Sequence, residues 1–249
     1  MRIQVFGSIL YDMTNLVKYI SDCGAASRRQ SEARIRAGAV RVDGAVETDP
    51  ARKLAGTETV TLDGRTLTPP ARRRYILLHK PRGYVCSNAD PHAELLAVDL
   101  IGLPGKLVSA GRLDKESEGA IIFSDDGEFV NILAHPRYEV RKKYRVSTAS
   151  PLPPEAFSRI LAGIDDDGET LRALEVHPLG DCEYEFVLNA GRKREIRRLV
   201  RACGSSVTRL VRTQIGSVKL DGLPPGKWRE LDDAEVARLR HGGTEEGQP

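Results

Sequence analysis

The sequence predicts an α+β fold in two parts, a small module over residues 13–70 and a larger domain over residues 71–241. The first part has two short helical patterns followed by short alternating strands. A Pro-Pro pair at residues 69–70 and an arginine run at residues 72–74 then mark a linker. Beyond the linker, strand and helix patterns mix without a regular strand-helix repeat, which favours a mixed, mainly antiparallel sheet over a doubly wound parallel one.

The first helix is predicted to begin near Thr14. The apolar residues Leu16, Ile20 and Cys23 recur at helical spacing and share one face. Gly24 follows, where a glycine commonly ends a helix because it adopts the left-handed conformation without strain.

A second, arginine-rich helix follows directly. Ser27 with Gln30 three positions later has the form of a capping box, and the pattern closes near Gly38. The exposed face of this helix carries four arginines, which are Arg28, Arg29, Arg34 and Arg36. A rigid basic helix offers phosphate contacts to a folded nucleic acid, although a solvated charged face is the simpler alternative.

Two tight hairpins are predicted after the helices. Alternating apolar residues flank the Asp-Gly pair at residues 43–44, and the same pattern recurs around the pair at residues 63–64. Asp-Gly is typical of two-residue hairpin turns, since both positions tolerate the left-handed conformation. The first part is therefore two short helices followed by small strands.

The two ends of the chain are expected to lie outside the fold. Residues 1–12 do not continue the pattern that begins at Met13, which indicates an upstream extension or a translation start placed too early. The tail GGTEEGQP, residues 242–249, has the composition of a disordered segment. There is no apolar run of about 18 residues and no signal-peptide pattern, so we expect a soluble, cytoplasmic protein without a membrane segment.

Basic residues are concentrated in two places. The formal net charge of the whole chain is only +3, but arginines gather from Arg28 to Arg41 and again from Arg192 to Arg212. Two such segments indicate a polyanionic partner. The four cysteines and five histidines are widely scattered, with no CxxC pair, so neither a disulfide framework nor a metal site is predicted.

Three segments could carry chemistry: HKPRGYV at residues 79–85, GRLDKESEG at residues 111–119 and NAGRKREIRRL at residues 189–199. Each is weak alone, because an aspartate between apolar strands is more often a cap, a turn residue or an ion-pair partner. In this order they resemble the bacterial ribosomal-RNA pseudouridine synthases. The stretches AIIFSDDGEFVNILAHPRYEVRKKYRV and LVRTQIGSVKLDGLPPGKWREL also match, and the resemblance extends from about Met13 to Leu239.

The N-terminal run LVKYISDCGAASRRQSEARIRAGAVRVDGAV is similar to the alpha-L RNA-binding motif, which occurs in a ribosomal small-subunit protein and in several RNA-modifying enzymes. The order helix, arginine-rich helix, hairpin is the specific part of this similarity. The resemblance implies that the chain binds ribosomal RNA or a pre-ribosomal particle. In that role Arg28, Arg29 and Arg36 would contact RNA phosphates.

The activity implied by the resemblance is the isomerisation of a specific uridine to pseudouridine. The glycosidic bond is broken, the base rotates, and its carbon 5 joins the sugar. No redox change occurs, so no cofactor or metal is expected, and the chain is expected to act as a monomer. A carboxylate can attack covalently and then leave, and the resemblance assigns that role to Asp114.

A cation is expected beside this nucleophile, because a buried carboxylate tends to hold its proton. The resemblance carries this role to Arg197, with Arg194 and Arg198 as neighbours that the helical spacing does not exclude. The same helix has an apolar face at spacing i, i+3, i+4, i+7 and an arginine face at the same spacing. We therefore expect a cleft in which Asp114 meets an arginine of this helix.

Further roles follow from the same resemblance. The target base must leave its helix, and Arg112 would fill the gap while Tyr144 stacks on the base and assists proton movement at carbon 5. Without the resemblance, Tyr144 is a strand tyrosine packed at a domain edge. Three residues of the first segment are expected to brace the cleft: Lys80, Pro81 and Gly83. Arg194 and Arg198 are also expected near the RNA.

Several alternatives stay open. The stretch GRKREIRRLVRACG is more similar to the branch of the family that acts on large-subunit ribosomal RNA. The resemblance therefore implies a large-subunit substrate, with small-subunit RNA as the alternative. A ribosome-associated RNA-binding protein without catalytic activity would need only residues 13–70. A hydrolase of small molecules with an aspartate nucleophile would have little use for two arginine clusters.

Overall fold

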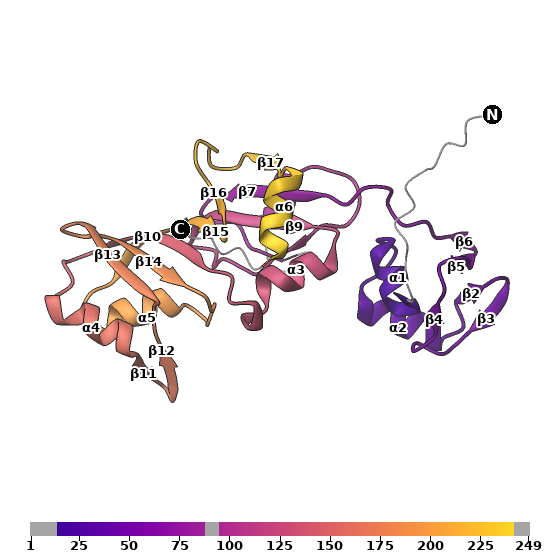
Figure 1. Cartoon of the computed structure of the whole chain (residues 1–249), viewed down its shortest axis with the longest axis horizontal. Helices are drawn as coiled ribbons and strands as arrows, with labels where there is room; N and C mark the ends of the chain where they lie inside the picture. The colour runs from indigo at the N-terminus through magenta and orange to yellow at the C-terminus, as the bar shows by residue number, and fades with distance from the viewer. Residues whose placement is uncertain (1–13, 88–94, 242–249) are drawn as a thin grey trace. The chain divides into compact units, whose positions relative to one another are not determined.

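The computed structural model describes residues 14–87 and 95–241, and the chain divides into two compact units, Met1–Arg73 and Arg74–Pro249 (Figure 1). The expected extension at residues 1–12 and the tail at residues 242–249 lie outside the described residues. Within those residues, no helix is long and apolar enough to cross a membrane. Each unit is considered by itself below.

The N-terminal unit begins with two short helices, as predicted. Helix α1 (Leu16–Asp22) is capped by Asn15, whose side chain accepts a hydrogen bond from the Val17 amide at 2.8 Å. Helix α2 (Arg28–Arg36) is capped by Ser27, which forms the complete capping box with Gln30. The predicted box is therefore confirmed, and it satisfies two amides that a helix start would otherwise leave unpaired.

Short strands complete this unit. One sheet has the order β3-β2-β5-β6, and β1 (Thr14–Asn15) pairs with β4 (Lys53–Leu54) in a second. Both predicted hairpins are confirmed, with β2 (Val40–Val42) joined to β3 (Ala45–Glu47) and β5 (Val60–Leu62) joined to β6 (Arg65–Thr66). At the first turn Asp43 and Gly44 have φ of 50° and 83°, which the Asp-Gly pair accommodates.

The C-terminal unit is built on a nine-stranded sheet. Its path is β13-β14-β10-β15-β9-β7-β17, with β16 on β15 and β8 on β9. Every pair in it is antiparallel except β9 with β15, which confirms the predicted α+β class. The strands are β7 (Tyr75–Lys80), β8 (Val108–Ser109), β9 (Glu118–Ser124), β10 (Lys142–Thr148), β13 (Glu175–Gly180), β14 (Glu183–Leu188), β15 (Val207–Ile215), β16 (Val218–Lys219) and β17 (Trp228–Glu230).

Helices cover both faces of this sheet. Side chains alternate along its central strands, so that Ile121 packs into one apolar cluster and Ile122 into another. The first cluster includes α4 (Pro154–Ala162) and α5 (Glu195–Ala202), and the second includes α3 (Gly127–Ala134) and α6 (Asp233–Arg240). The smaller elements are η1 (Ala97–Leu100), η2 (Pro136–Tyr138), β11 (Ile164–Asp166) and β12 (Glu169–Leu171).

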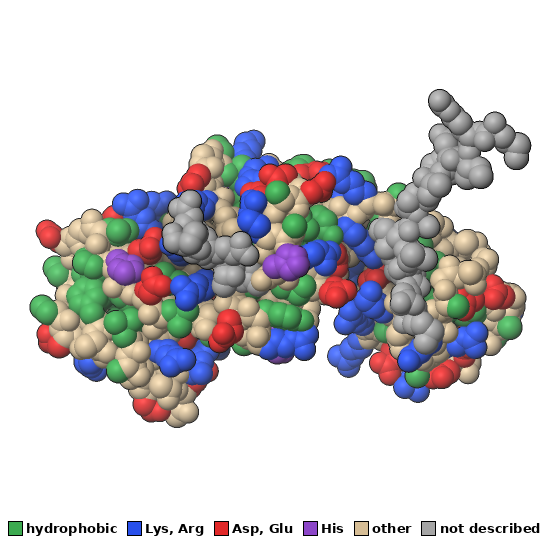
Figure 2. Space-filling model, in the orientation of Figure 1, with side chains coloured by type: hydrophobic (Ala, Val, Ile, Leu, Met, Phe, Trp, Pro, Cys, Tyr) green, Lys and Arg blue, Asp and Glu red, His purple; other side chains and the backbone are tan. Residues whose placement is uncertain are grey.

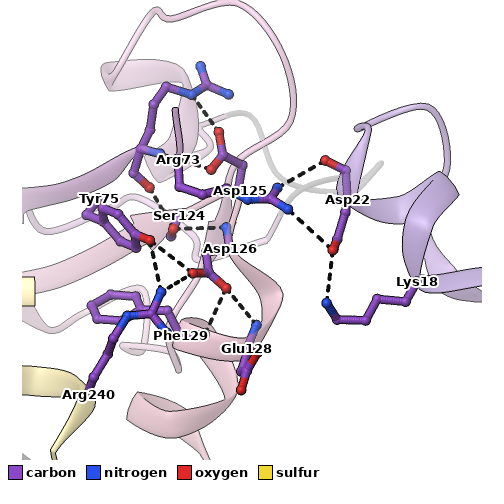
Figure 3. Close-up of polar contacts among 11 residues, drawn as sticks. Lys18, Asp22, Arg73, Tyr75, Ser124, Asp125, Asp126, Glu128, Phe129 and Arg240 are labelled. Carbon is purple, nitrogen blue, oxygen red and sulfur yellow. Dashed lines mark hydrogen bonds and ion pairs between the residues drawn. The ribbon is translucent and has the colours of Figure 1, made fainter. Parts of the chain in front are cut away.

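A polar junction fastens α3 and α6 to β7. Asp126 caps α3 by accepting the Glu128 and Phe129 amides, and it also accepts from the Tyr75 hydroxyl at 3.0 Å and from Arg240 (Figure 3). Burial opposes the charge on Asp126, but these hydrogen bonds and the arginine outweigh it and hold the pKa of Asp126 below its usual value.

The N-terminal unit has its own buried carboxylate. Asp22 lies within 3.1 Å of the Lys18 ammonium and 3.3 Å of the Arg73 guanidinium, also drawn in Figure 3. These ion pairs connect Asp22, the last residue of α1, to Arg73 at the end of the unit. They stabilise the C-terminal end of the helix, just before Gly24.

Candidate active site

The loop that carries Asp114 is hydrogen-bonded to Lys80, the last residue of β7. We call residues 110–117, between β8 and β9, the carboxylate loop. The ammonium of Lys80, which is fully buried, donates to the carbonyls of Pro81 at 2.9 Å and Ser117 at 2.7 Å. The Gly83 amide donates to the Lys115 carbonyl at 2.8 Å. Since β7 is a core strand, these bonds fix the loop to a rigid element.

Gly119 brings the carboxylate loop against the middle of the sheet. Its φ is +110°, and a Cβ at this position would lie 2.2 Å from the Arg212 carbonyl oxygen. Only glycine permits this approach of β9 to β15. Arg212 in turn pairs with Tyr144 on β10, so three adjacent strands carry the loop, a buried arginine and the expected tyrosine side by side.

A cavity of about 760 Å³ opens at this place. Its walls combine apolar side chains from the core with a basic segment that leads into α5. The residues that line it are Val85, Cys86, Ser87, Gly111, Arg112, Leu113, Asp114, Lys115, Ser117, Ala134, Pro136, Lys142, Tyr144, Leu188, Asn189, Ala190, Gly191, Arg192, Lys193, Arg194, Glu195, Ile196, Leu210 and Arg212. The expected residues Asp114, Tyr144, Arg112 and Arg194 therefore share one cavity.

The environment of Asp114 differs from the expectation in one respect. Its side chain is exposed at the cavity wall, whereas the sequence predicted a buried carboxylate that requires a neighbouring cation. Among the described residues, no arginine or lysine lies within 4.0 Å of its carboxylate.

Arg197 holds the carboxylate loop by its backbone. Its guanidinium donates to the carbonyls of Glu116 and Val207, each at 3.2 Å, and its Nε has no acceptor among the described residues. Burial and the neighbouring Arg194 lower the pKa of Arg197, while Asp114 opposes this shift. The charges of Asp114 and Arg197 thus interact across the loop without direct contact, because two carbonyls already occupy the guanidinium.

The other two arginines at the start of α5, Arg194 and Arg198, differ in their ion pairs and in whether they line the cavity. Arg198 is bound to Asp166 and, at 2.6 Å, to Glu169, so it is turned away from the cavity. Arg194 precedes the helix with φ of 54° and is exposed, which leaves its charge available at the cavity wall. A neighbouring groove of about 530 Å³ is lined by the arginines of this helix together with Asp166, Asp167, Lys193, Ser206 and Val207.

Tyr144 and Arg112 occupy different depths of the cavity. Tyr144 is 8% exposed and belongs to the core cluster, whereas Arg112 is exposed. Tyr144 is therefore packed in the core and also lines the cavity, so its packing does not exclude the role that the resemblance implies.

The arginines of α2 are all exposed. Arg36 pairs with Glu32 at 3.0 Å, while Arg28 and Arg29 have no acidic partner in the part of the chain that the structure describes. Figure 2 shows Lys and Arg side chains gathered over α1 and α2. This surface suits contacts with phosphates.

Lys142 and Arg212 also line the cavity, and neither was a candidate site residue in the sequence. Lys142 lies two residues before Tyr144 and so shares its face of β10, a signal that strand alternation could have given. Arg212 meets β9 through the parallel pair, and no local pattern indicates that contact. The described residues contain no group of histidine, cysteine or acidic side chains able to hold a metal ion.

Comparisons with known proteins agree on one family. The family model described as RNA pseudouridylate synthase matches residues 74–202, and the S4 domain model matches residues 14–69. The chain is 33% identical to the ribosomal large subunit pseudouridine synthase B of Bacillus subtilis (strain 168), covering 92% of this chain and 96% of that one. It is 31% identical to the ribosomal small subunit pseudouridine synthase A of Salmonella typhimurium, covering 90% and 99%. A crystal structure of a pseudouridylate synthase superposes with a TM-score of 0.67 at 29% identity, covering 90% of this chain and 99% of that chain.

Proposed function

The chain belongs to the RNA pseudouridylate synthase family, and from this premise we propose that it isomerises a specific uridine of ribosomal RNA to pseudouridine. The observation that carries the proposal is the cavity that joins Asp114 to Tyr144 in a chain matching the family over residues 74–202. The S4 domain at residues 14–69 adds an RNA-binding module, and both named relatives act on ribosomal RNA.

Asp114 is the nucleophile in this proposal. Its carboxylate is exposed to the cavity and bound to no cation in the described residues, so an oxygen is free to attack carbon 1′ of the ribose. The loop is fastened at Ser117 by Lys80, at Lys115 by Gly83 and at Glu116 by Arg197. Arg197 thereby acts as a positioning residue, since it holds the backbone of the carboxylate loop at Glu116.

Tyr144 supplies a platform for the flipped base. Tyr144 lies on β10, which pairs with β14 and β15, and its buried side chain lines the cavity. A flat ring can accept the base before and after rotation. Arg112 lies at the exposed wall on the same loop as the nucleophile, where a long cationic side chain can occupy the space that the base leaves.

RNA is bound over two basic regions in this proposal. The exposed Arg28 and Arg29 at the start of α2 and Arg36 at its end contact phosphates through the N-terminal unit, and Arg194 does so at the cavity. Arg198 is paired with two acids and contributes less than the sequence predicts. The substrate is large-subunit RNA, free or in a pre-ribosomal particle, and the chain acts as a cytoplasmic monomer.

The test is a map of pseudouridine in both ribosomal RNAs from cells with and without the gene. One large-subunit position is expected to lose its modification and to regain it on incubation of the purified chain with the RNA. Loss of a small-subunit position instead would correct the substrate, and unchanged maps together with inactivity in vitro would overturn the proposed activity.

A further inference from the structure

Two buried cations, on the adjacent strands β10 and β15, line the cavity. Lys142 and Tyr144 are two residues apart on β10, so their side chains point to the same face of the sheet. Arg212 is the cross-strand partner of Tyr144 on β15. A register shift between Lys143 and Tyr144 interrupts the ladder at this point. Such irregularities change the direction of side chains, and they are frequent beside active sites.

Neither cation has a carboxylate partner among the described residues. The Lys142 ammonium donates to the Val140 carbonyl at 2.9 Å, and the Arg212 Nε donates to the Ala120 carbonyl at 2.6 Å. The Nη2 of Arg212 has no acceptor within the described ranges, although the side chain is only 2% exposed. Two charges buried without an anion are costly, so the arrangement indicates an acceptor that arrives with the substrate.

Lys142 is only 9% exposed, and this burial lowers the pKa of its ammonium group. Loss of hydration, reinforced by the charge of Arg212, lowers the pKa of Lys142 to about 8. A hydrophobic side chain would fill this position at less cost.

We propose that Arg212 and Lys142 form a subsite for the carbonyl oxygens of the target uracil, where they stabilise the base as an anion while it is detached from the sugar. This inference rests on the proposed function and adds two catalytic residues to it. The ligand is a planar base with two oxygens, and donors fixed in advance stabilise the charge that develops on such oxygens.

The charge follows from the bonds that change. Asp114 attacks carbon 1′, the bond from carbon 1′ to N1 breaks, and its electron pair stays on the uracil, which becomes an anion spread over N1 and the two oxygens. After rotation, carbon 5 attacks carbon 1′ and the bond to Asp114 breaks, which returns the electron pair to the carboxylate. Carbon 5 then loses its proton and N1 gains one, so the isomerisation is balanced without a cofactor.

The walls around the two cations favour a base over a phosphate group. Leu113, Leu188, Ile196 and Leu210 line the cavity together with the Tyr144 ring. A uracil presents two apolar faces and polar edges, so it can pack between such side chains and direct its oxygens at the cations. A phosphodiester presents charge in all directions and would leave these apolar walls unused.

The test compares Lys142→Met and Lys142→Arg with wild type under single-turnover conditions at saturating ribosomal RNA. Lys143→Met is the matched control, because Lys143 is adjacent but points to the other face of the strand. Removing one preorganised donor typically slows the chemical step about 100-fold, so Lys142→Met is expected to lose rate by about that factor with little change in RNA affinity. Arg212→Lys should also lose rate, although it keeps the charge, because the direction of the Nη2 donor changes.

A pH profile separates catalysis from structure. The other titratable or charged groups that line the cavity are Arg212 of β15, Tyr144 of β10, Cys86, the α5 entry (Arg192, Lys193, Arg194, Glu195) and the loop residues Arg112, Asp114 and Lys115. The wild-type rate should fall as pH rises through about 8, where Lys142 loses its proton, and Lys142→Arg should remove this alkaline fall. A mainly structural role would leave the profile unchanged.

Failure of this inference and failure of the proposed function are distinguishable. If the wild type forms no pseudouridine in either ribosomal RNA, the proposed function is wrong. If the wild type is active but Lys142→Met weakens only RNA affinity at unchanged rate, or keeps full activity, the uracil subsite is overturned.

Discussion

Lys142→Met is expected to make the C-terminal unit more stable. A lysine whose pKa is about 8 in the folded protein, against 10.5 ordinarily, is charged at pH 7 at a cost. At about 1.4 kcal/mol per pH unit, this cost is about 3 kcal/mol relative to the unfolded chain. Methionine has a similar length and no charge to bury, so the variant should recover most of this free energy of unfolding.

The stability difference between Lys142→Met and wild type should also depend on pH. Between pH 8 and pH 10.5 the unfolded chain binds more protons at this position than the folded one, so wild-type stability rises with pH there. The advantage of Lys142→Met should therefore shrink from about 3 kcal/mol at pH 7 to about 1 kcal/mol at pH 9.5.

Urea denaturation followed by tryptophan fluorescence measures this directly. Trp228 is the one tryptophan of the sequence and lies in β17 of the same sheet, so the signal reports the C-terminal unit. Lys143→Met serves as the control and should show no comparable gain. A variant that is less stable than wild type at pH 7, or a gain that does not change with pH, would refute the reasoning about the buried charge.

Three further predictions concern the scaffold. Gly119→Ala should unfold the C-terminal unit or abolish its activity, since the new Cβ would meet the Arg212 backbone at 2.2 Å; circular dichroism can test this against Gly222→Ala, where φ is also positive but the space is open. Ser27→Ala should destabilise the N-terminal unit by about 1 kcal/mol through loss of the cap, and an unchanged thermal midpoint for that unit would contradict it. Lys80→Met should lower the single-turnover rate more than RNA affinity, because the carboxylate loop loses its anchor; an equal loss of both would indicate general misfolding instead.

The features that the sequence predicted correctly depend on residues that are close together in the chain. The capping box at Ser27 and the Asp-Gly hairpins depend on neighbouring residues only, and the structure contains them. The face of α5 formed by Ile196, Leu199 and Val200 is buried as its spacing predicts.

The contacts of Arg197 and Arg212 were not predicted, because they join segments that are far apart in the sequence. Arg197 reaches the Glu116 carbonyl rather than the carboxylate of Asp114, because the turn of the carboxylate loop decides which atom faces the helix. Arg212 donates to Ala120, which lies 92 positions earlier in the chain. Only the pairing of β9 with β15 creates that contact, and neither strand pattern specifies its partner.

The role of Asp114 is the central claim, and tritium release tests it most directly. Ribosomal RNA labelled with tritium at carbon 5 of uridine loses the label to water when pseudouridine forms, so wild type and Asp114→Asn can be compared on the same transcript. The substitution keeps the size of an exposed side chain, and RNA binding measured in parallel confirms that the variant is folded. Our account predicts normal binding with no release above background, whereas release near the wild-type rate would contradict it.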